Sequence, residues 1–171
     1  MTLQERAERI KMVVMDVDGT LTDGAMYYGM EGEMMKRFST RDGMGITLLQ
    51  RAGLVPAIIT SEHSIIAQQR ALKLKIDHIV LGSHDKTAAL TSLATQAGVA
   101  LDAVAYIGDD VNDGPVMRVC ALAGCPSDAV ETIRQSAHFV CSLPGGHGAV
   151  REFIEFILRA QGHAVTLTEG W

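Results

Sequence analysis

Short apolar runs and longer amphipathic stretches alternate along this chain. The runs are rich in β-branched residues, which is typical of buried strands. The predicted strands lie near Met12–Met15, Ala57–Ile59, His78–Val80, Ala103–Ile107, Leu122–Gly124 and His138–Val140. The amphipathic stretches predict helices near Gly43–Arg51, Ile65–Leu74, Lys86–Ala97, Val111–Val119 and Gly148–Ala160. This alternation predicts an α/β fold built on a doubly wound parallel sheet.

One segment, Ala25–Thr40, breaks the alternation. It contains Tyr27-Tyr28, a candidate turn at Met30-Glu31-Gly32-Glu33, and a second run at Met34–Ser39, so it predicts a β-hairpin. The chain has 171 residues, which suits one domain with one core of ordinary size. Residues 161–171 carry weak signals, and we expect them to form a flexible tail.

The first predicted strand ends in paired acids. Asp16 and Asp18 directly follow Met12–Met15, and Gly19 comes next. For both acids to face one ligand, we expect the chain to turn just after Asp16, and Gly19 permits such a turn. Two converging carboxylates repel each other, and a divalent cation is the simplest group that relieves this repulsion.

A second acidic cluster follows another predicted strand. The segment Gly108-Asp109-Asp110-Val111-Asn112-Asp113 comes directly after Ala103–Ile107. In open α/β sheets, ligands bind at the carboxyl ends of the strands, so both clusters are expected at one edge. Oxygen ligands of this kind suit Mg²⁺.

Two more residues complete a set suited to phosphoryl transfer. Thr60 follows the strand at Ala57–Ile59, and Lys86 opens a predicted helix. A hydroxyl and an ammonium group can bind phosphoryl oxygens and stabilise the charge that develops on them. A solvated lysine at a helix start is the alternative for Lys86, because single lysines are usually surface residues.

These elements closely resemble the haloacid dehalogenase superfamily of phosphohydrolases. The matching elements, in order, are Asp16-x-Asp18-Gly19-Thr20, Thr60, Lys86 and Gly108-Asp109-Asp110-x-x-Asp113. Further segments resemble its capless branch, which acts on 3-deoxy-D-manno-octulosonate 8-phosphate or on related nine-carbon ulosonate 9-phosphates. These segments are Leu21-Thr22-Asp23-Gly24, Lys36-Arg37-Phe38, Arg41-Asp42-Gly43-Met44-Gly45 and Gly145-Gly146-x-Gly148-Ala149-Val150-Arg151-Glu152. The resemblance implies a Rossmannoid core with a small hairpin flap, no cap domain, and a homotetramer.

The parts and the resemblance together suggest a role for each residue. Asp16 is the expected nucleophile, which forms an aspartyl-phosphate. Asp18 is the expected general acid and then general base, and its backbone carbonyl is implied to touch the metal. Asp109 is the expected third Mg²⁺ ligand. Thr60 and Lys86 are expected to bind the transferring phosphoryl group.

Supporting and substrate-binding residues are expected around this set. Asp113 is expected to hold Lys86 or a metal-bound water, and Asp110 to support its loop. The expected substrate-binding residues are Thr60, Ser61, Glu62, Arg70, Lys73 and Lys86.

One departure bears on the substrate. The octulosonate phosphatases usually carry Thr-Gly-Arg where this chain has Thr60-Ser61-Glu62. An arginine would suit a substrate carboxylate, which Glu62 cannot bind. Glu62 with Lys73 resembles the nine-carbon phosphatases, although the two residues could also be an ordinary pair on a helix surface. The expected substrate class is a small 2-keto-3-deoxy sugar acid with a terminal phosphate.

Composition limits the kinds of partner that we expect this protein to bind. The chain is 47% hydrophobic and 20% charged, with a net charge of −5, so we expect a globular protein that binds no nucleic acid. Three cysteines without metal spacing, and no membrane span or signal peptide, favour a cytoplasmic protein. Two alternatives stay open: a phosphoacceptor signalling module, and a non-catalytic regulatory domain of a sugar-nucleotide synthase.

Overall fold

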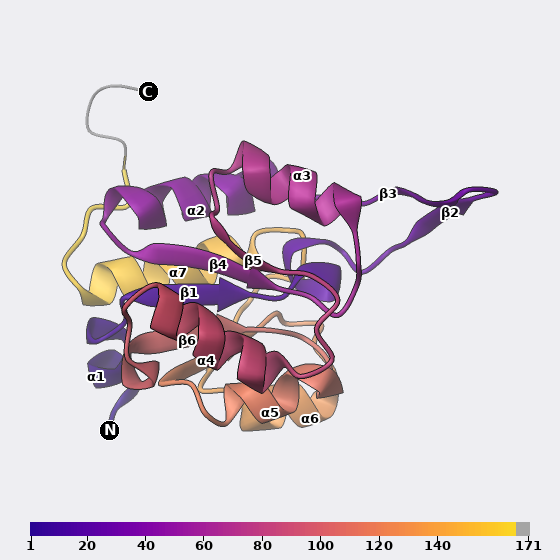
Figure 1. The fold of residues 1–171 in the computed structure, drawn as a ribbon. Helices are drawn as coiled ribbons and strands as arrows, with labels where there is room; N and C mark the ends of the chain where they lie inside the picture. The colour runs from indigo at the N-terminus through magenta and orange to yellow at the C-terminus, as the bar shows by residue number, and fades with distance from the viewer. Residues whose placement is uncertain (167–171) are drawn as a thin grey trace.

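A computed structural model describes residues 1–166 of the chain. Six parallel strands form one sheet in the order β5-β4-β1-β6-β7-β8 (Figure 1). The strands are β1 (Met12–Met15), β4 (Val55–Ile59), β5 (His78–Val80), β6 (Val104–Ile107), β7 (Leu122–Cys125) and β8 (Phe139–Val140). The order of the strands in the sheet reverses direction at β1, which pairs with both β4 and β6. That switch point is where open α/β sheets bind their ligands.

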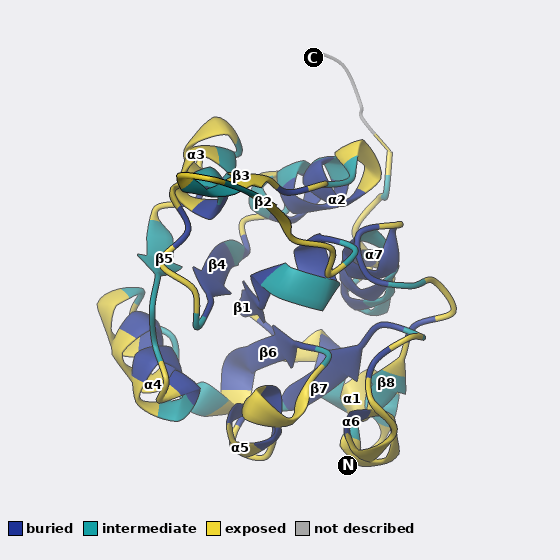
Figure 2. Ribbon diagram, turned by 90° about the vertical axis from the view of Figure 1, so that its right-hand side faces the viewer, coloured by how far each residue is buried: buried dark blue, intermediate teal, exposed yellow. Residues whose placement is uncertain are grey.

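Helices cover both faces of the sheet, as seen along the strands in Figure 2. One layer holds α1 (Leu3–Glu8), α2 (Thr40–Arg51), α3 (Ile65–Lys73) and α7 (Ala149–Ala160). The other layer holds α4 (Lys86–Gln96), α5 (Gly114–Met117) and α6 (Glu131–Ser136). Among residues 1–166, no helix combines the length and the apolar character needed to cross a membrane.

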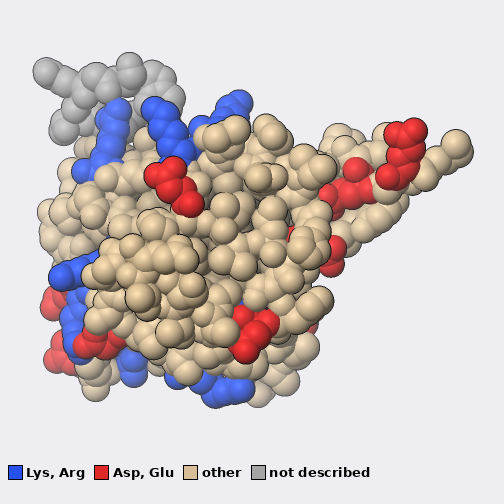
Figure 3. Space-filling model, in the orientation of Figure 1, with Lys and Arg blue, Asp and Glu red and all other residues tan. Residues whose placement is uncertain are grey.

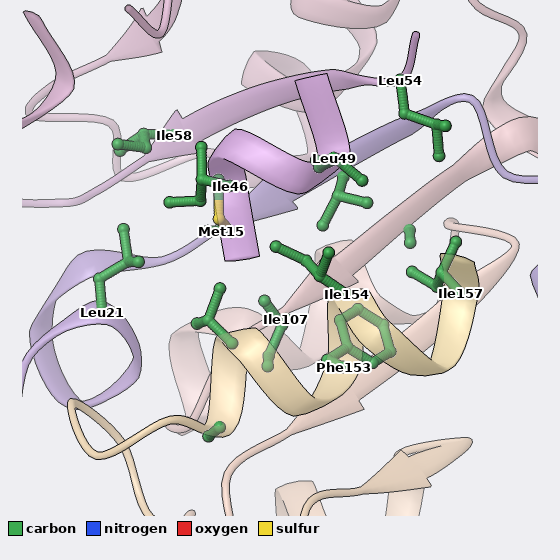
Figure 4. Packing of buried hydrophobic residues seen from close by; sticks show 14 of the residues in the cluster. Met15, Leu21, Ile46, Leu49, Leu54, Ile58, Ile107, Phe153, Ile154 and Ile157 are labelled. Atoms are coloured by element: carbon green, nitrogen blue, oxygen red, sulfur yellow. The ribbon is translucent and has the colours of Figure 1, made fainter. Parts of the chain in front are cut away.

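Alternate residues of each strand feed two separate hydrophobic cores. In β1, Val13 and Met15 belong to the core under α2 and α7, whereas Met12 and Val14 belong to the core under α4. Because both faces are buried, the strand is continuously apolar, as parallel strands usually are. Figure 4 shows the first core, where side chains of α2 and α7 point toward one another over β1.

The hairpin consists of β2 (Tyr27–Gly29) and β3 (Gly32–Met35), which pair antiparallel. It projects beyond the carboxyl ends of the sheet, at the right of Figure 1. In Figure 3 this projection shows acidic and uncharged side chains but no basic ones. Its exposed large apolar residues are Met26, Tyr27, Tyr28, Met30, Met34 and Met35. We call the segment 25–36 the flap.

The predicted sheet, the hairpin and most helices are confirmed, one predicted helix needs correction, and two helices were not predicted. The expected helix at Val111–Val119 is a 3₁₀ turn over Val111–Asp113 followed by the short α5. Asp110 caps that turn through its carboxylate, which satisfies the backbone without a long helix. Helices α1 and α6, each six residues long, were not predicted. Of the expected tail, residues 167–171 lie outside the described residues.

Candidate active site

The loop after β1 brings Asp16 to the edge of the sheet. The Asp16 backbone N–H donates to the carbonyl of Ile107 at 3.0 Å, so pairing with β6 fixes the start of this loop. Beyond it, Val17–Leu21 forms an irregular turn in which Gly19 has a φ of +87°. A Cβ on Gly19 would lie 2.1 Å from the Asp109 carboxylate. Gly19 therefore allows both the left-handed backbone and the approach of the second acidic loop.

The second loop is organised by the carboxylate of Asp113, which is fully buried. One of its oxygens accepts hydrogen bonds from Lys86 Nζ and the Tyr106 hydroxyl, both at 2.6 Å. The other accepts from the backbone N–H groups of Asp109 at 2.9 Å and Asp110 at 3.2 Å. With four donors, Asp113 is occupied by the protein and shapes the loop that presents Asp109.

Lys86 joins the two loops. Its ammonium group is buried and donates to Asp16 Oδ1 at 2.7 Å as well as to Asp113. Burial alone would lower the pKa of Lys86, but the carboxylates of Asp16 and Asp113 outweigh it and raise that pKa. Lys86 is therefore buried between two carboxylates, and the alternative of a solvated surface lysine is wrong.

The acids outnumber this single lysine. Burial and the neighbouring Asp113 raise the pKa of Asp16 well above its ordinary value, even though Lys86 lowers it. The same two causes raise the pKa of Asp109 to about 7. A further positive charge would offset both the burial and the mutual repulsion of these carboxylates.

The donor set fits a hard divalent cation. Oxygen atoms of Asp16, Asp109 and Asp113 lie within 4.8 Å of one another. Asp113 is already saturated, so Asp16 and Asp109 are the acids left to ligate. The remaining oxygens of Asp16 and Asp109 suit Mg²⁺ or a similar ion.

A pocket of about 150 Å³ opens over Asp16 and Asp18. Its lining residues are Asp16, Asp18, Thr60, Ser61, Glu62, Asp110 and Asn112. Thr60 is buried, and its hydroxyl accepts a hydrogen bond from the Glu62 backbone N–H at 3.2 Å. Asn112 donates to Ser61 at 3.3 Å and so joins the two sides of the pocket.

Three expected substrate-binding residues do not line this pocket: Lys86, which contacts Asp16 beneath it, and Arg70 and Lys73, which lie elsewhere. Arg70 donates to the Ser39 carbonyl at 3.1 Å and stacks over the Phe38 ring, 5.6 Å from its centre. It therefore holds the segment that leads from the flap into α2. Lys73 ends α3 and lines a separate cavity with Gln50. Their substrate roles stay predictions that this pocket does not require.

Sequence reasoning missed several residues that shape the site. Lys36 contacts Asp18 from the flap, Tyr106 donates to Asp113, and the Thr20 hydroxyl donates to Asp109 Oδ1 at 3.1 Å. Lys36 had a signal, because it begins the Lys36-Arg37-Phe38 segment. Tyr106 had none, since a tyrosine within an apolar strand looks like core.

The glycine-rich segment before α7 supports the first loop rather than forming a nucleotide site. A Cβ on Gly145 would lie 1.8 Å from the Gly19 carbonyl oxygen. The Gly146 backbone N–H donates to the Thr20 carbonyl at 3.0 Å, and Arg37 donates to the Gly146 carbonyl at 3.2 Å. This segment therefore packs directly against the backbone that follows Asp16.

Comparison with known proteins agrees with this geometry. Residues 57–154 match the family described as haloacid dehalogenase-like hydrolase. The 3-deoxy-D-manno-octulosonate 8-phosphate phosphatase of Haemophilus influenzae is 40% identical over 160 residues, 94% of this chain and 89% of that protein.

Solved structures agree as well. The Moraxella catarrhalis 3-deoxy-D-manno-octulosonate 8-phosphate phosphatase, in complex with magnesium, phosphate and KDO, gives a TM-score of 0.90 at 39% identity. The match covers 94% of this chain and 92% of that one. The cobalt-bound Haemophilus influenzae enzyme gives 0.90 at 40% identity, covering 92% of each chain.

Proposed function

Because the chain belongs to the haloacid dehalogenase-like hydrolases and is a phosphatase, we propose that it removes the terminal phosphate of a 2-keto-3-deoxy sugar acid. We favour 3-deoxy-D-manno-octulosonate 8-phosphate, since relatives about 40% identical carry that activity in their names. The observation that carries the proposal is the convergence of Asp16, Asp109 and buried Lys86 at one sheet edge. That arrangement suits a dianionic phosphate.

The metal is Mg²⁺ in this proposal. Asp16, Asp109 and the backbone carbonyl of Asp18 would hold it. Bound there, it would neutralise the crowded carboxylates and stabilise negative charge on the phosphoryl oxygens. A magnesium-bound relative supports this choice.

The protein groups supply the bond-making steps. Asp16 attacks phosphorus and forms an aspartyl-phosphate, while Lys86 and the Thr60 hydroxyl bind the transferring oxygens. Asp18 protonates the departing sugar oxygen and later accepts a proton from the water that hydrolyses the intermediate. Asp113 orients Lys86, and Asp110 supports the loop that carries Asp109.

Glu62 supports a second candidate substrate, a nine-carbon ulosonate 9-phosphate. Its side chain lines the pocket, where it would accept hydrogen bonds from a sugar hydroxyl or amide. It would repel a substrate carboxylate placed at the same point. Ser61 would bind beside it, and we keep Arg70 and Lys73 as proposed contacts for the sugar end.

We also propose that residues 1–171 form one domain and that the protein assembles as a homotetramer. The pocket, about 150 Å³, is smaller than the roughly 300–1,000 Å³ typical of ligand sites. It accommodates a phosphoryl group but leaves most of a sugar acid uncovered. The exposed apolar side chains of the flap suit contact with a neighbouring subunit, whose site they would close.

Two other functions are less well supported by the site. A phosphoacceptor module keeps its phosphate and has no use for a second acid at Asp18, which speeds hydrolysis. A purely regulatory domain has no use for the Lys86–Asp113 pair, because a buried ion pair is costly to maintain.

Phosphate release separates these functions. The purified protein with Mg²⁺ should release phosphate over many turnovers from the eight-carbon 8-phosphate and the nine-carbon 9-phosphate, and the ratio of kcat/KM values identifies the substrate. No turnover on either ester, with a folded protein and added Mg²⁺, would contradict the proposed function.

A further inference from the structure

The flap carries a buried lysine whose position the reaction outlined above does not explain. The Lys36 ammonium group has no solvent exposure, although the residue lies at the base of an otherwise exposed hairpin. It donates to Asp18 Oδ1 and to Glu33 Oε1, the latter at 2.6 Å. A buried cation is tolerated only where anions surround it, so these two carboxylates determine its place.

The contact continues from the flap into the body of the protein. The second oxygen of Glu33 accepts a hydrogen bond from the Ser64 hydroxyl at 2.5 Å. Ser64 is buried and caps α3 by accepting from the Ala67 backbone N–H at 3.3 Å. A continuous chain of polar contacts therefore links Asp18, Lys36, Glu33 and the first turn of α3.

This chain uses the two oxygens of Asp18 differently. Lys36 holds Oδ1, while Oδ2 is buried and has no partner in the described part of the chain. A buried oxygen left without a partner is costly, so its orientation calls for a ligand. Asp18 also lines the pocket, and Oδ2 is the oxygen available for a group bound there.

We propose that Lys36, held by Glu33, is a positioning residue that directs Asp18 Oδ2 at the leaving oxygen of the substrate. As the bond from Asp16 to phosphorus forms, the bond from phosphorus to the sugar oxygen breaks, and that oxygen takes the proton from Oδ2. Lys36 keeps its protons throughout. The proposal rests on the phosphatase function, which supplies the leaving oxygen.

The consequence is that the flap takes part in protonating the leaving group. Glu33 and Lys36 lie on the hairpin, whereas Asp18 and Ser64 lie on the body. Seating the flap on Ser64 and orienting Asp18 are then one event. A displaced flap would leave Asp16 and Lys86 intact but would misdirect the acid.

A series of leaving groups tests this. Esters of strongly acidic phenols, such as 2,4-dinitrophenyl phosphate, need no proton on departure, whereas sugar and alkyl phosphates do. General acid catalysis contributes typically about 10²–10⁴-fold. Lys36→Met should therefore lower kcat on the sugar phosphate by about 100-fold or more, with 2,4-dinitrophenyl phosphate changed by less than about threefold. KM should hardly change.

Two further variants serve as a second test and as a control. Glu33→Gln keeps the volume but weakens the hold on Lys36, and it should give a smaller loss with the same dependence on the leaving group. It also carries the test if Lys36→Met fails to fold, as judged by thermal unfolding. Lys11→Met, an exposed lysine at the amino end of β1, should leave both esters unchanged.

The outcomes are distinct. Equal losses on both esters, or no loss on either, would overturn the positioning role of Lys36 while wild-type turnover stands. If the wild type hydrolyses neither ester, the proposed function fails, and the role of Lys36 falls with it.

Discussion

Two buried lysines contact acids of this site, and they differ in what holds them in place. Lys86 begins a helix of the body and lies between Asp16 and Asp113, which follow neighbouring strands. Lys36 lies on the flap between Asp18 and Glu33, and only Asp18 belongs to the body. The core of the sheet determines the first arrangement. The second depends on the hairpin, whose Glu33 contacts the body at Ser64.

The difference separates two tasks. The Lys86 side acts on the phosphoryl group, which every substrate of a phosphatase shares. The Lys36 side acts on the leaving oxygen, which belongs to the part that varies between substrates. The sheet edge thus serves the constant task, and the flap serves the variable one.

Replacing the nucleophile should stop all turnover. Asp16→Asn is nearly isosteric but cannot form the acyl-phosphate, so kcat should fall by orders of magnitude on every ester. Thermal unfolding should show an intact fold, and Asp77→Asn, an exposed acid, is the matched control. More than about a tenth of the wild-type kcat, a one-decade change, would show that Asp16 is not the nucleophile.

Removing the metal should stop turnover as completely as replacing Asp16. Chelation should abolish phosphate release, and Mg²⁺ should restore it, because Asp16 and Asp109 need a cation between them. Asp109→Ala should raise the Mg²⁺ requirement or eliminate activity. Full activity in excess chelator would rule out this part of the proposal.

The same acids predict how stability depends on pH. In the metal-free protein the pKa of Asp109 is raised to about 7, chiefly by burial, against about 3.9 in an unfolded chain. Between these two pKa values the folded state holds a proton that the unfolded state has lost. The free energy of unfolding therefore falls as the pH rises through this range. Mg²⁺ should therefore raise Tm more at pH 8 than at pH 5, as calorimetry can measure. An equal rise in Tm at both pH values would contradict this prediction.

Removing the body lysine should affect all esters alike. Lys86→Met deletes a donor to the transferring oxygens, and such losses typically cost about 10²–10³ in kcat. The loss should be as large on 2,4-dinitrophenyl phosphate as on the sugar phosphate, unlike that of Lys36→Met. If Lys86→Met spared the activated ester, the division between the two lysines would be wrong.

Opening the flap contact should have a smaller effect that depends on the substrate. Tyr28→Ser with Met30→Ser removes exposed apolar surface without touching Lys36. Light scattering should show smaller particles, and kcat/KM on the sugar phosphate should fall by about tenfold, because the site is left open to water. Leu72→Ser, an exposed leucine on α3, is the control. A monomer fully active on a small sugar phosphate would refute the tetramer.

The smallest effect concerns the choice of sugar. Glu62→Arg should shift preference toward the eight-carbon substrate by about tenfold to a hundredfold in kcat/KM, roughly 1–3 kcal/mol for a mismatched polar contact. Activity on a generic phosphate ester should hardly change, because Asp16 and Lys86 are untouched. Equal losses on all substrates would assign Glu62 to the Thr60 loop instead.

The sequence predicts the body of this protein better than the flap side of the site. Asp16 and Asp109 could be placed together because each follows an apolar strand, and parallel strands end at one edge. Lys36 could not be paired with Asp18, since that contact joins residues 18 apart through a hairpin whose path depends on tertiary packing. The Glu33–Ser64 bond spans 31 residues and has no local signal.

The helices also show where prediction from the sequence succeeds and where it fails. The boundaries of α3 and α4 were predictable because their periodic patterns are long. The expected helix at Val111–Val119 failed because Asp110 and Asp113 bind backbone groups within their own loop. Helix α1 had a usable signal that was overlooked, a capping box between Thr2 and Glu5.

The close packing at Gly19 and Gly145 has a consequence for how this chain tolerates mutation. At both positions an added methyl group would overlap atoms that hold the site together, the Asp109 carboxylate in one case and the Gly19 carbonyl in the other. Neither glycine has chemistry of its own. A saturation library screened for phosphate release should nevertheless find both positions nearly as restricted as Asp16. Even alanine should fail there, while larger changes pass at an exposed position away from the site, such as Leu72.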